Sequence, residues 1–365
     1  MKVLDKYLVR ELLIPIIFCS LTLVFLILIA DLFDNLDELL RNKTPLSIVI
    51  RYYLCLMPIA FTQTIAWAVW LATIFLLVNL GLHNELMAMK SAGLRILTII
   101  RPLLFLGILI GIITFLVSDR IVPKTFRKAN ELLEVYIEKK KDTQDAKILK
   151  NVTYYSGGNQ LYYFRKFSPK NKTVEDVIVI WLNPVTQRTA QKIFAKSGFW
   201  TPEGWTFEGI TEYQTDAQGG ILGEPRNFPQ KTYPEIQVTP KDLINATSDS
   251  IFLSYRDMKY SIEKLKENGV PVYSETVDLN KRLAAPWQGL VMMLLAIPFL
   301  GSVRTRKAIA VHVLICAGLV FAFHVSDAVT IALGKSGKLL PFLSAWGGNI
   351  FFGTLAFMRL NHANY

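Results

Sequence analysis

Six long stretches of this sequence contain almost no charged side chains, and this feature limits the possible folds more than any other. The third stretch is interrupted once, by Arg101. The stretches are residues 12–30, 52–84, 96–118, 283–303, 308–326 and 339–358. A helix of about 20 predominantly apolar residues can cross a bilayer because it satisfies all of its own backbone polar groups. The sequence therefore predicts six transmembrane helices.

The first apolar stretch also has the charged front of a signal peptide, "MKVLDKYLVREL". A signal peptide has an apolar region of about 7–15 residues followed by a small-residue cleavage site. Residues 12–30 exceed that length, and no such cleavage site follows them. We therefore expect this stretch to be retained as the first transmembrane helix.

The lysines and arginines of the short loops are distributed unequally between the two sides of the membrane. One side carries Lys2, Lys6, Arg10, Lys90, Arg95, Arg101, Arg304, Arg306, Lys307 and Arg359. The other carries Arg41, Lys43, Arg51, Lys335 and Lys338. Because cytoplasmic loops are enriched in these residues, the first side is predicted to be cytoplasmic. Both termini and the loop around residues 84–94 then lie inside, and the large region 119–282 lies outside.

Three parts follow from this layout: a membrane half at 1–118, an outer domain at 119–282 and a second membrane half at 283–365. We expect the third helix to continue beyond the membrane. After residue 148 the sequence shows a hairpin around "SGGN" and about seven to ten short antiparallel strands, typical of a sandwich or open roll. A helix follows, with Ser254 as its cap, Met258 and Ile262 on its apolar face and Gly269 at its end. The predicted fold is an α-helical membrane protein with an inserted all-β, jelly-roll-like domain.

The motifs of common enzymes are missing from the sequence. "LGKSGK" at 333–338 resembles a phosphate-binding loop, but Val329 stands where the motif requires its first glycine. The four histidines have no metal-ligand spacing. We expect no catalytic residue, no metal site, no bound cofactor and no nucleic-acid partner. The net charge of +11 is better explained by anionic lipid or an anionic substrate.

Four segments, in order, resemble the LptF/LptG family of permeases that export lipopolysaccharide from the bacterial inner membrane. They are "VLDKYLVREL", "NELMAMKSAG", "LNKRLAAPWQGLVMMLLAIPF" and "SGKLLPFLSAWGGNIFF". The resemblance implies an LptF–LptG heterodimer, an LptB-type ATPase that binds ATP and Mg and hydrolyses the nucleotide, and an LptC-type bridge protein in the periplasm. The substrate implied is lipopolysaccharide, which is passed through the periplasmic β domain. LptG is slightly favoured over LptF.

The resemblance also implies a role for residues 84–94, as a short coupling helix that docks on the ATPase. Glu85 matches the family's acid that contacts the ATPase. Leu86 and Met89 lie on one face of a helix, where they can fill an apolar groove. Gly93 is expected to end the helix. The alternative is a solvated turn between two crossings.

A second group of residues is expected at the substrate path. Where LptG-type members carry basic residues, the end of the first helix has Asp31, Asp34, Asp37 and Glu38. Contact with the lipid head would then fall to Arg41 and Lys43, unless this segment is only a solvated loop. Helices one and five form the lateral gate of the family. The gate candidates here are Phe25, Leu26, Phe323 and Asp327, although Asp327 is also compatible with a position at the water interface.

Two other functions remain as alternatives. One is a sensor or scaffold with an outer β domain, but the short cytoplasmic loops leave no room for a signalling output. The other is a secondary transporter of another amphiphile, which usually needs ionisable residues in the middle of the membrane. These helices contain few.

Overall fold

The computed structural model describes residues 3–137, 149–156, 159–169, 171–182, 189–215, 221–236, 238–247, 253–267, 271–300 and 306–362. Its contacts divide the chain into a helical unit of residues 1–129 and 273–365 and a second unit of residues 130–272. The sequence boundaries at 118 and 282 differ from this division, because residues 119–129 and 273–282 pack with the helices.

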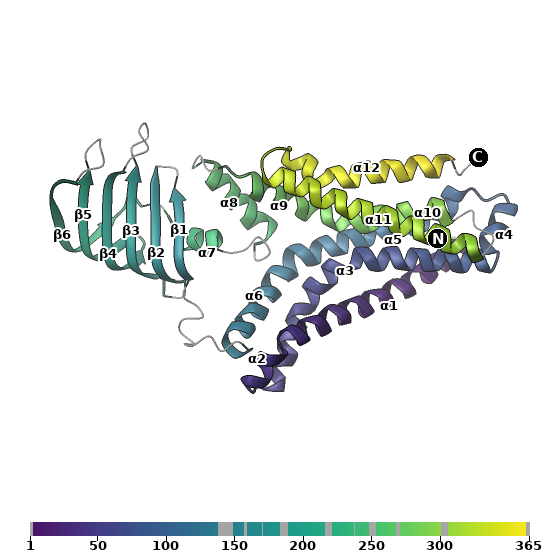
Figure 1. Ribbon diagram of the computed structural model, residues 1–365, viewed down its shortest axis with the longest axis horizontal. Helices are drawn as coiled ribbons and strands as arrows, with labels where there is room; N and C mark the ends of the chain where they lie inside the picture. The colour runs from purple at the N-terminus through teal and green to yellow at the C-terminus, as the bar shows by residue number, and fades with distance from the viewer. Residues whose placement is uncertain are drawn as a thin grey trace. The chain divides into compact units, whose positions relative to one another are not determined.

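The helical unit begins with α1 (Val3–Asp34), α2 (Leu36–Arg41), α3 (Leu46–Leu82), α4 (Glu85–Ser91) and α5 (Ile96–Leu116). The helix of α5 continues through η1 (Val117–Ile121), α6 (Val122–Leu132) and η2 (Leu133–Ile137). This confirms that the third helix extends beyond its apolar stretch. The unit is completed by α9 (Tyr273–Ala284), η5 (Ala285–Trp287), α10 (Gln288–Leu300), α11 (Arg306–Lys335) and α12 (Pro341–His362). Both termini lie at the end of the unit that carries α4 (Figure 1).

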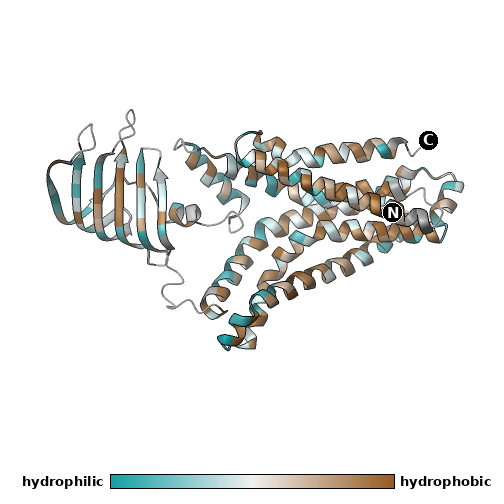
Figure 2. Cartoon of the chain, viewed as in Figure 1, coloured by the Kyte–Doolittle hydropathy of each residue, from teal (hydrophilic) through white to brown (hydrophobic). Residues whose placement is uncertain are grey.

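Four helical segments of the described chain are long and apolar enough to cross a membrane. They are Val3–Asp34, Leu46–Leu82, Leu97–Ile137 and Ala310–Lys335. Hydrophobic residues cover most of α1, α3 and α11, whereas hydrophilic residues gather at α2 (Figure 2). The remaining two predicted crossings coincide with α10 and α12, so the total of six stays a prediction.

Helix α1 buries every fourth residue along its length. These residues are Leu8, Leu12, Ile16, Ser20, Val24 and Leu28, and the helix packs against α3. Residues four apart share one face of a helix, so the opposite face is left uncovered. Phe18, Phe25 and Leu26 are more than half exposed there. A water-soluble protein rarely exposes so much contiguous apolar surface, and such a face suits lipid or another membrane helix.

The second unit contains one antiparallel sheet in the order β1-β2-β3-β4-β5-β6. The strands are β1 (Leu149–Ser156), β2 (Gln160–Ser168), β3 (Thr173–Leu182), β4 (Thr189–Thr201), β5 (Gly204–Thr215) and β6 (Ile221–Tyr233). The predicted hairpin is confirmed, because Tyr155 pairs with Leu161 across the "SGGN" turn. Helices α7 (Pro240–Thr247) and α8 (Tyr255–Glu267) follow. The described part is thus a six-stranded meander with two helices, where the sequence predicted an all-β jelly roll of more and shorter strands.

One row of residues interrupts every ladder of this sheet. In each pair of neighbouring strands, the residues just before and just after this row are Cα partners in one register. The two residues within the row itself are not paired. The row, which we call the crease row, comprises Asn151, Arg165, Asp176, Lys196, Gly209 and Pro229. The backbone φ is positive at Asn151, Asp176 and Gly209, with values of 56°, 48° and 63°. These left-handed residues are rare in strands because most side chains disfavour them.

The buried face changes its sequence phase at the crease row. In β2, Phe164 and Phe167 are both fully buried although they are three residues apart, whereas a regular strand alternates with a period of two. Val174 and Val177 of β3 repeat this shift. Because of it, both halves of the sheet turn their apolar side chains into the same core cluster. Ile236, Val238 and Leu243 belong to the same cluster, so the core is enclosed by the sheet together with α7 and the segment that precedes it.

Replacing Gly209 with Val is expected to destabilise this unit by about 1–3 kcal/mol, because a β-branched residue is strained at positive φ. Replacing Gly209 with Asn should cost less, since Asn tolerates this conformation better. Hydrogen exchange of peptides covering β4, β5 and β6 in the micelle-bound chain measures the difference. Equal exchange in the two variants would show that the φ of Gly209 is not under strain.

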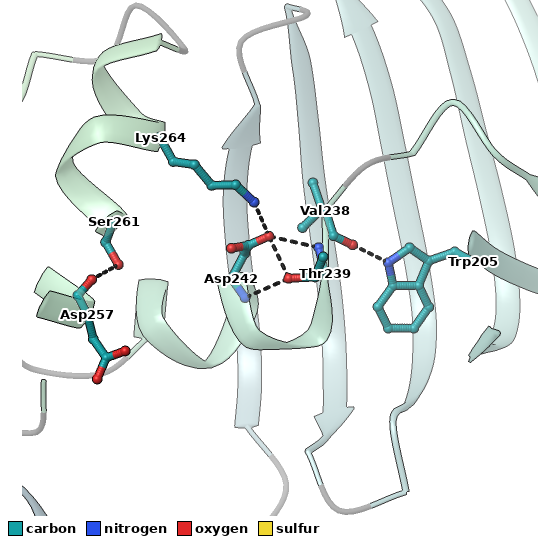
Figure 3. A network of polar contacts seen from close by, with 7 residues as sticks. All are labelled: Trp205, Val238, Thr239, Asp242, Asp257, Ser261 and Lys264. Atoms are coloured by element: carbon teal, nitrogen blue, oxygen red, sulfur yellow. Dashed lines mark hydrogen bonds and ion pairs between the residues drawn. The ribbon is translucent and has the colours of Figure 1, made fainter. Parts of the chain in front are cut away.

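Polar contacts join α8 to α7, and a separate hydrogen bond joins the segment before α7 to β5 (Figure 3). The fully buried Trp205 donates from Nε1 to the backbone oxygen of Val238 at 2.7 Å. Thr239 donates to the carboxylate of Asp242 from its backbone N–H at 2.9 Å and from its hydroxyl at 2.7 Å. Lys264 of α8 donates to the same carboxylate oxygen. Burial lowers the pKa of Lys264, but its hydrogen bond to Asp242 and the charge of Asp242 outweigh this and raise that pKa above its ordinary value.

The predicted helix after the strands is confirmed as α8. Asp257 donates from its backbone N–H to the Ser254 hydroxyl at 3.3 Å, as expected of a helix cap. Met258 and Ile262 are buried. Gly269, the predicted end of this helix, lies outside the described residues.

Candidate functional site

Helix α4 is a short helix in the turn between the long helices α3 and α5. Gly93 follows it with a φ of 79°. The backbone N–H of Leu94 donates to Met89 and that of Gly93 donates to Lys90. This pair of bonds is a Schellman motif, in which a glycine in the left-handed conformation stops a helix. The prediction that Gly93 ends the helix is confirmed.

Glu85 begins α4 and has a specific partner on α1. The Tyr7 hydroxyl donates a hydrogen bond to Oε2 of Glu85 at 2.8 Å, and both residues are half-buried. The position of Glu85 in the first turn is itself favourable, since a carboxylate there complements the helix dipole. Within the described part of the chain, no other hydrogen bond reaches this carboxylate. The sequence singled out Glu85 but gave no indication of Tyr7, which lies 78 positions away.

The predicted apolar face of α4 points toward the chain itself. Leu86 and Met89 are half-buried and pack against the core cluster that includes Leu8 and Leu80. Met87 is 39% exposed, and Ala88 beside it is also exposed. A partner that approaches α4 therefore meets Met87 and Ala88 more fully than Leu86 and Met89.

The opposite end of α1 is tied to α3 by a similar contact. The Tyr52 hydroxyl donates to the carboxylate of Asp31, with the shorter of the two distances at 3.1 Å. Asn35 also donates to Oδ2 of Asp31, at 3.2 Å. Arg41 and Lys43 are exposed at the end of α2. The acid-rich segment therefore uses Asp31 to hold the helices together and leaves the two basic side chains available.

Asp327 lies on α11, at the centre of a polar cluster. Only 8% of Asp327 is exposed, and Gln288 donates to its Oδ2 at 3.3 Å. His324, one turn earlier, stacks on the ring of Trp67 with centroids 4.4 Å apart. Asp327 is thus buried between helices of its own chain.

A cavity of about 240 Å³ adjoins this cluster. Its polar lining comprises Thr62, Gln63, Thr114, Lys281, Gln288 and His324. His324 is one of the four histidines for which the sequence shows no metal-ligand spacing; the other five residues were not singled out from the sequence. Lys281 and Gln288 belong to the segment "LNKRLAAPWQGL", but nothing in the sequence indicated that their side chains meet α3 and α11.

The candidates for contact with lipid tails differ in exposure. Phe25 and Leu26 are 53% and 57% exposed on α1. Phe323 is fully buried, against His324 and Phe352. The Phe323 side chain therefore exposes no surface that a lipid could contact, in contrast to the expectation from the sequence.

Comparison with known protein families gives one match that covers nearly the whole chain. The family described as "Lipopolysaccharide export system permease LptF/LptG" matches residues 6–362. No curated protein matches the chain. The matched range includes Tyr7, Glu85 and Asp327, as well as the entire sheet.

Proposed function

Because this chain belongs to the LptF/LptG family of lipopolysaccharide export permeases, we propose that it is one permease subunit of an ATP-driven transporter in the bacterial inner membrane. The subunit takes lipopolysaccharide from the outer leaflet of that membrane and passes it to the unit that contains the sheet. Membership of the family over residues 6–362 is the observation that carries this proposal.

The proposed orientation places both termini and α4 in the cytoplasm and the sheet in the periplasm. The excess of lysine and arginine near α4 supports this orientation. It places Glu85 on the side of the membrane where ATP is present. An LptB-type ATPase then docks on α4 and supplies ATP and Mg, and this chain contributes Glu85, Met87 and Ala88 to the contact.

The partner in the membrane is the other permease of an LptF–LptG pair. The apolar face of α1 supports this assignment, because Phe25 and Leu26 project from a helix whose other face is covered by α3. Lipid enters between this face and the partner, with Arg41 and Lys43 near its phosphates. Arginine and lysine are the usual ligands of such anionic groups.

The sheet offers the next surface for the acyl chains. Its core contains Tyr162, Phe164, Trp205 and Phe207, all fully buried. Acyl chains that leave the membrane would reach these side chains only when the core opens, and would then exchange contact with water for contact with them. An LptC-type protein continues the path from an edge of the sheet.

Photo-crosslinking to labelled lipopolysaccharide in cells tests the proposal. A photoreactive residue at Leu26, which is 57% exposed, is expected to give an adduct that depends on ATP hydrolysis. The matched control is Leu28 on the same helix, which is 8% exposed and faces α3. No adduct at Leu26, or equal labelling at both positions, would contradict the substrate assignment.

A secondary transporter is the second candidate, and the polar cluster around Asp327 is the observation that favours it. Buried ionisable residues in membrane helices often mark ion-coupled transport. The two mechanisms differ in their energy source. If the adduct at Leu26 forms without ATP but disappears when the proton gradient is collapsed, the secondary transporter replaces the ATP-driven permease.

A further inference from the structure

The bond between Tyr7 and Glu85 joins the first membrane helix to α4. Tyr7 lies near the start of α1, and its hydroxyl reaches Oε2 of Glu85 at 2.8 Å. Around this bond, Leu4 and Tyr7 of α1 and Leu86 and Met89 of α4 pack against one apolar cluster. The two helices are therefore connected by a directional polar bond within an apolar contact.

We propose that Tyr7 is a positioning residue that orients the Glu85 carboxylate for its cationic partner and transmits displacement of α4 to α1. This inference rests on the proposed function, in which α4 receives the ATPase. Tyr7 itself need not touch the ATPase. Its hydroxyl occupies one oxygen of the carboxylate and leaves Oε1 to accept from a basic side chain.

The chemistry of the pair suits this role. A neutral phenol that donates to a carboxylate leaves the negative charge intact, so the acid can still attract a cation. Holding the carboxylate in one orientation before binding reduces the entropy that its side chain loses when the complex forms. A lysine or arginine in place of Tyr7 would neutralise the acid and compete with the partner.

The packing of α1 explains how a displacement would travel. One stripe of α1, from Leu8 to Leu28, is buried along the whole length of the helix. At its far end, Asp31 accepts a hydrogen bond from Tyr52 of α3. Helix α1 is thus held at both ends by tyrosine–carboxylate bonds, but only the bond of Tyr7 involves α4. Movement of α4 would pull directly on the helix that exposes Phe25 and Leu26.

The test compares Tyr7→Phe with Tyr52→Phe in the complete permease–ATPase complex. Both variants lose one hydroxyl that donates to an acid of the α1–α4 segment, and both keep the aromatic ring. Tyr7→Phe is expected to weaken ATPase binding about tenfold and to lower the yield of the Leu26 lipid adduct per ATP hydrolysed. Tyr52→Phe is expected to bind the ATPase as the unmodified chain does.

Two further variants separate positioning from general stability. With Glu85→Gln already present, Tyr7→Phe should cause no additional loss of ATPase binding, because the pair acts as a unit. With 4-aminophenylalanine at position 7, a donor returns at the same place, and binding should recover. This second variant also gives a result if Tyr7→Phe accumulates poorly.

The outcomes distinguish the inference from the proposed function. If the unmodified complex contains no ATPase, the proposed function fails and this inference fails with it. If the unmodified complex binds ATPase and crosslinks lipid, but Tyr7→Phe matches it in both measurements, only the role of Tyr7 is overturned. Equal losses from Tyr7→Phe with and without Glu85→Gln would also overturn it.

Discussion

Replacing Glu85 with Arg is expected to abolish recovery of the ATPase with this permease and, with it, ATP-dependent transport. The substitution removes the acceptor of the Tyr7 bond and reverses the charge that α4 offers to the proposed ATPase, for which we propose a basic side chain opposite Glu85. Removing one member of a hydrogen-bonded charge pair at an interface costs about 2–5 kcal/mol, and like charges add to that cost. The affinity for the ATPase should therefore fall by about 30-fold or more. Co-purification from detergent-solubilised membranes measures the loss.

The control for this substitution is Glu38→Arg. Glu38 is an exposed acid on α2, at the end of the helical unit away from α4, and its replacement changes the net charge by the same amount. The Glu38→Arg chain should retain the ATPase. If Glu85→Arg also retains it, α4 is not the docking site.

Replacing Asp242 with Ala is expected to destabilise the unit that contains the sheet by about 2–4 kcal/mol. Breaking a buried ion pair from one side costs about 3–5 kcal/mol. The value here should be somewhat lower, because 29% of the Lys264 side chain is exposed and can regain water. The change leaves the backbone N–H of Thr239 without its acceptor. Hydrogen exchange of peptides from β5 and α7 in the micelle-bound chain reports the change in the free energy of unfolding.

Two comparisons make this prediction specific to the buried network. Glu263→Ala removes an ion pair with Lys259 in which both side chains are more than half exposed, and such pairs contribute about 0–1 kcal/mol. The double substitution Asp242→Leu and Lys264→Met should recover much of the loss, because no unpaired charge remains. A loss from Asp242→Ala no larger than that from Glu263→Ala would show that the buried contacts of Asp242 with Thr239 and Lys264 do not stabilise this unit.

The sequence allowed the long helices, the end of α4 and the cap of α8 to be predicted, because each depends on residues close together in the chain. The apolar stretches predict α1 and α3 directly. Gly93 and Ser254 act on the turn next to them. The local signals were therefore sufficient at these positions.

The described residues form six strands, fewer than the seven to ten that the sequence predicted, and the crease row gives a physical reason for the difference. Around Asp176 the alternation of buried residues shifts by one, between Val174 and Val177. In the sequence alone, such a shift looks like the end of one strand and the start of another. Only the pairing of the strands places Asp176 opposite Arg165 and Lys196 and shows that the ladders of β2, β3 and β4 are interrupted in one row.

The two faces of α4 illustrate a second limit. Helical spacing correctly grouped Leu86 with Met89, but periodicity does not say whether a face points outward or toward the protein's own core. The burial of Leu86 and Met89 depends on α1 and α3. The partner of Glu85 was likewise inaccessible, because Tyr7 is brought near it only by the packing of α1 against α3.

A sheet whose neighbouring strands all leave the same row unpaired can rotate at that row without losing its other pairs. The Cα partners keep one register on both sides of the crease row, and three of its residues, Asn151, Asp176 and Gly209, have positive φ. A small rotation at these three residues would change the curvature of the sheet while the pairs on either side remain. In the proposed transport role, such a rotation would adjust the space that the sheet offers to the hydrocarbon tails of the lipid.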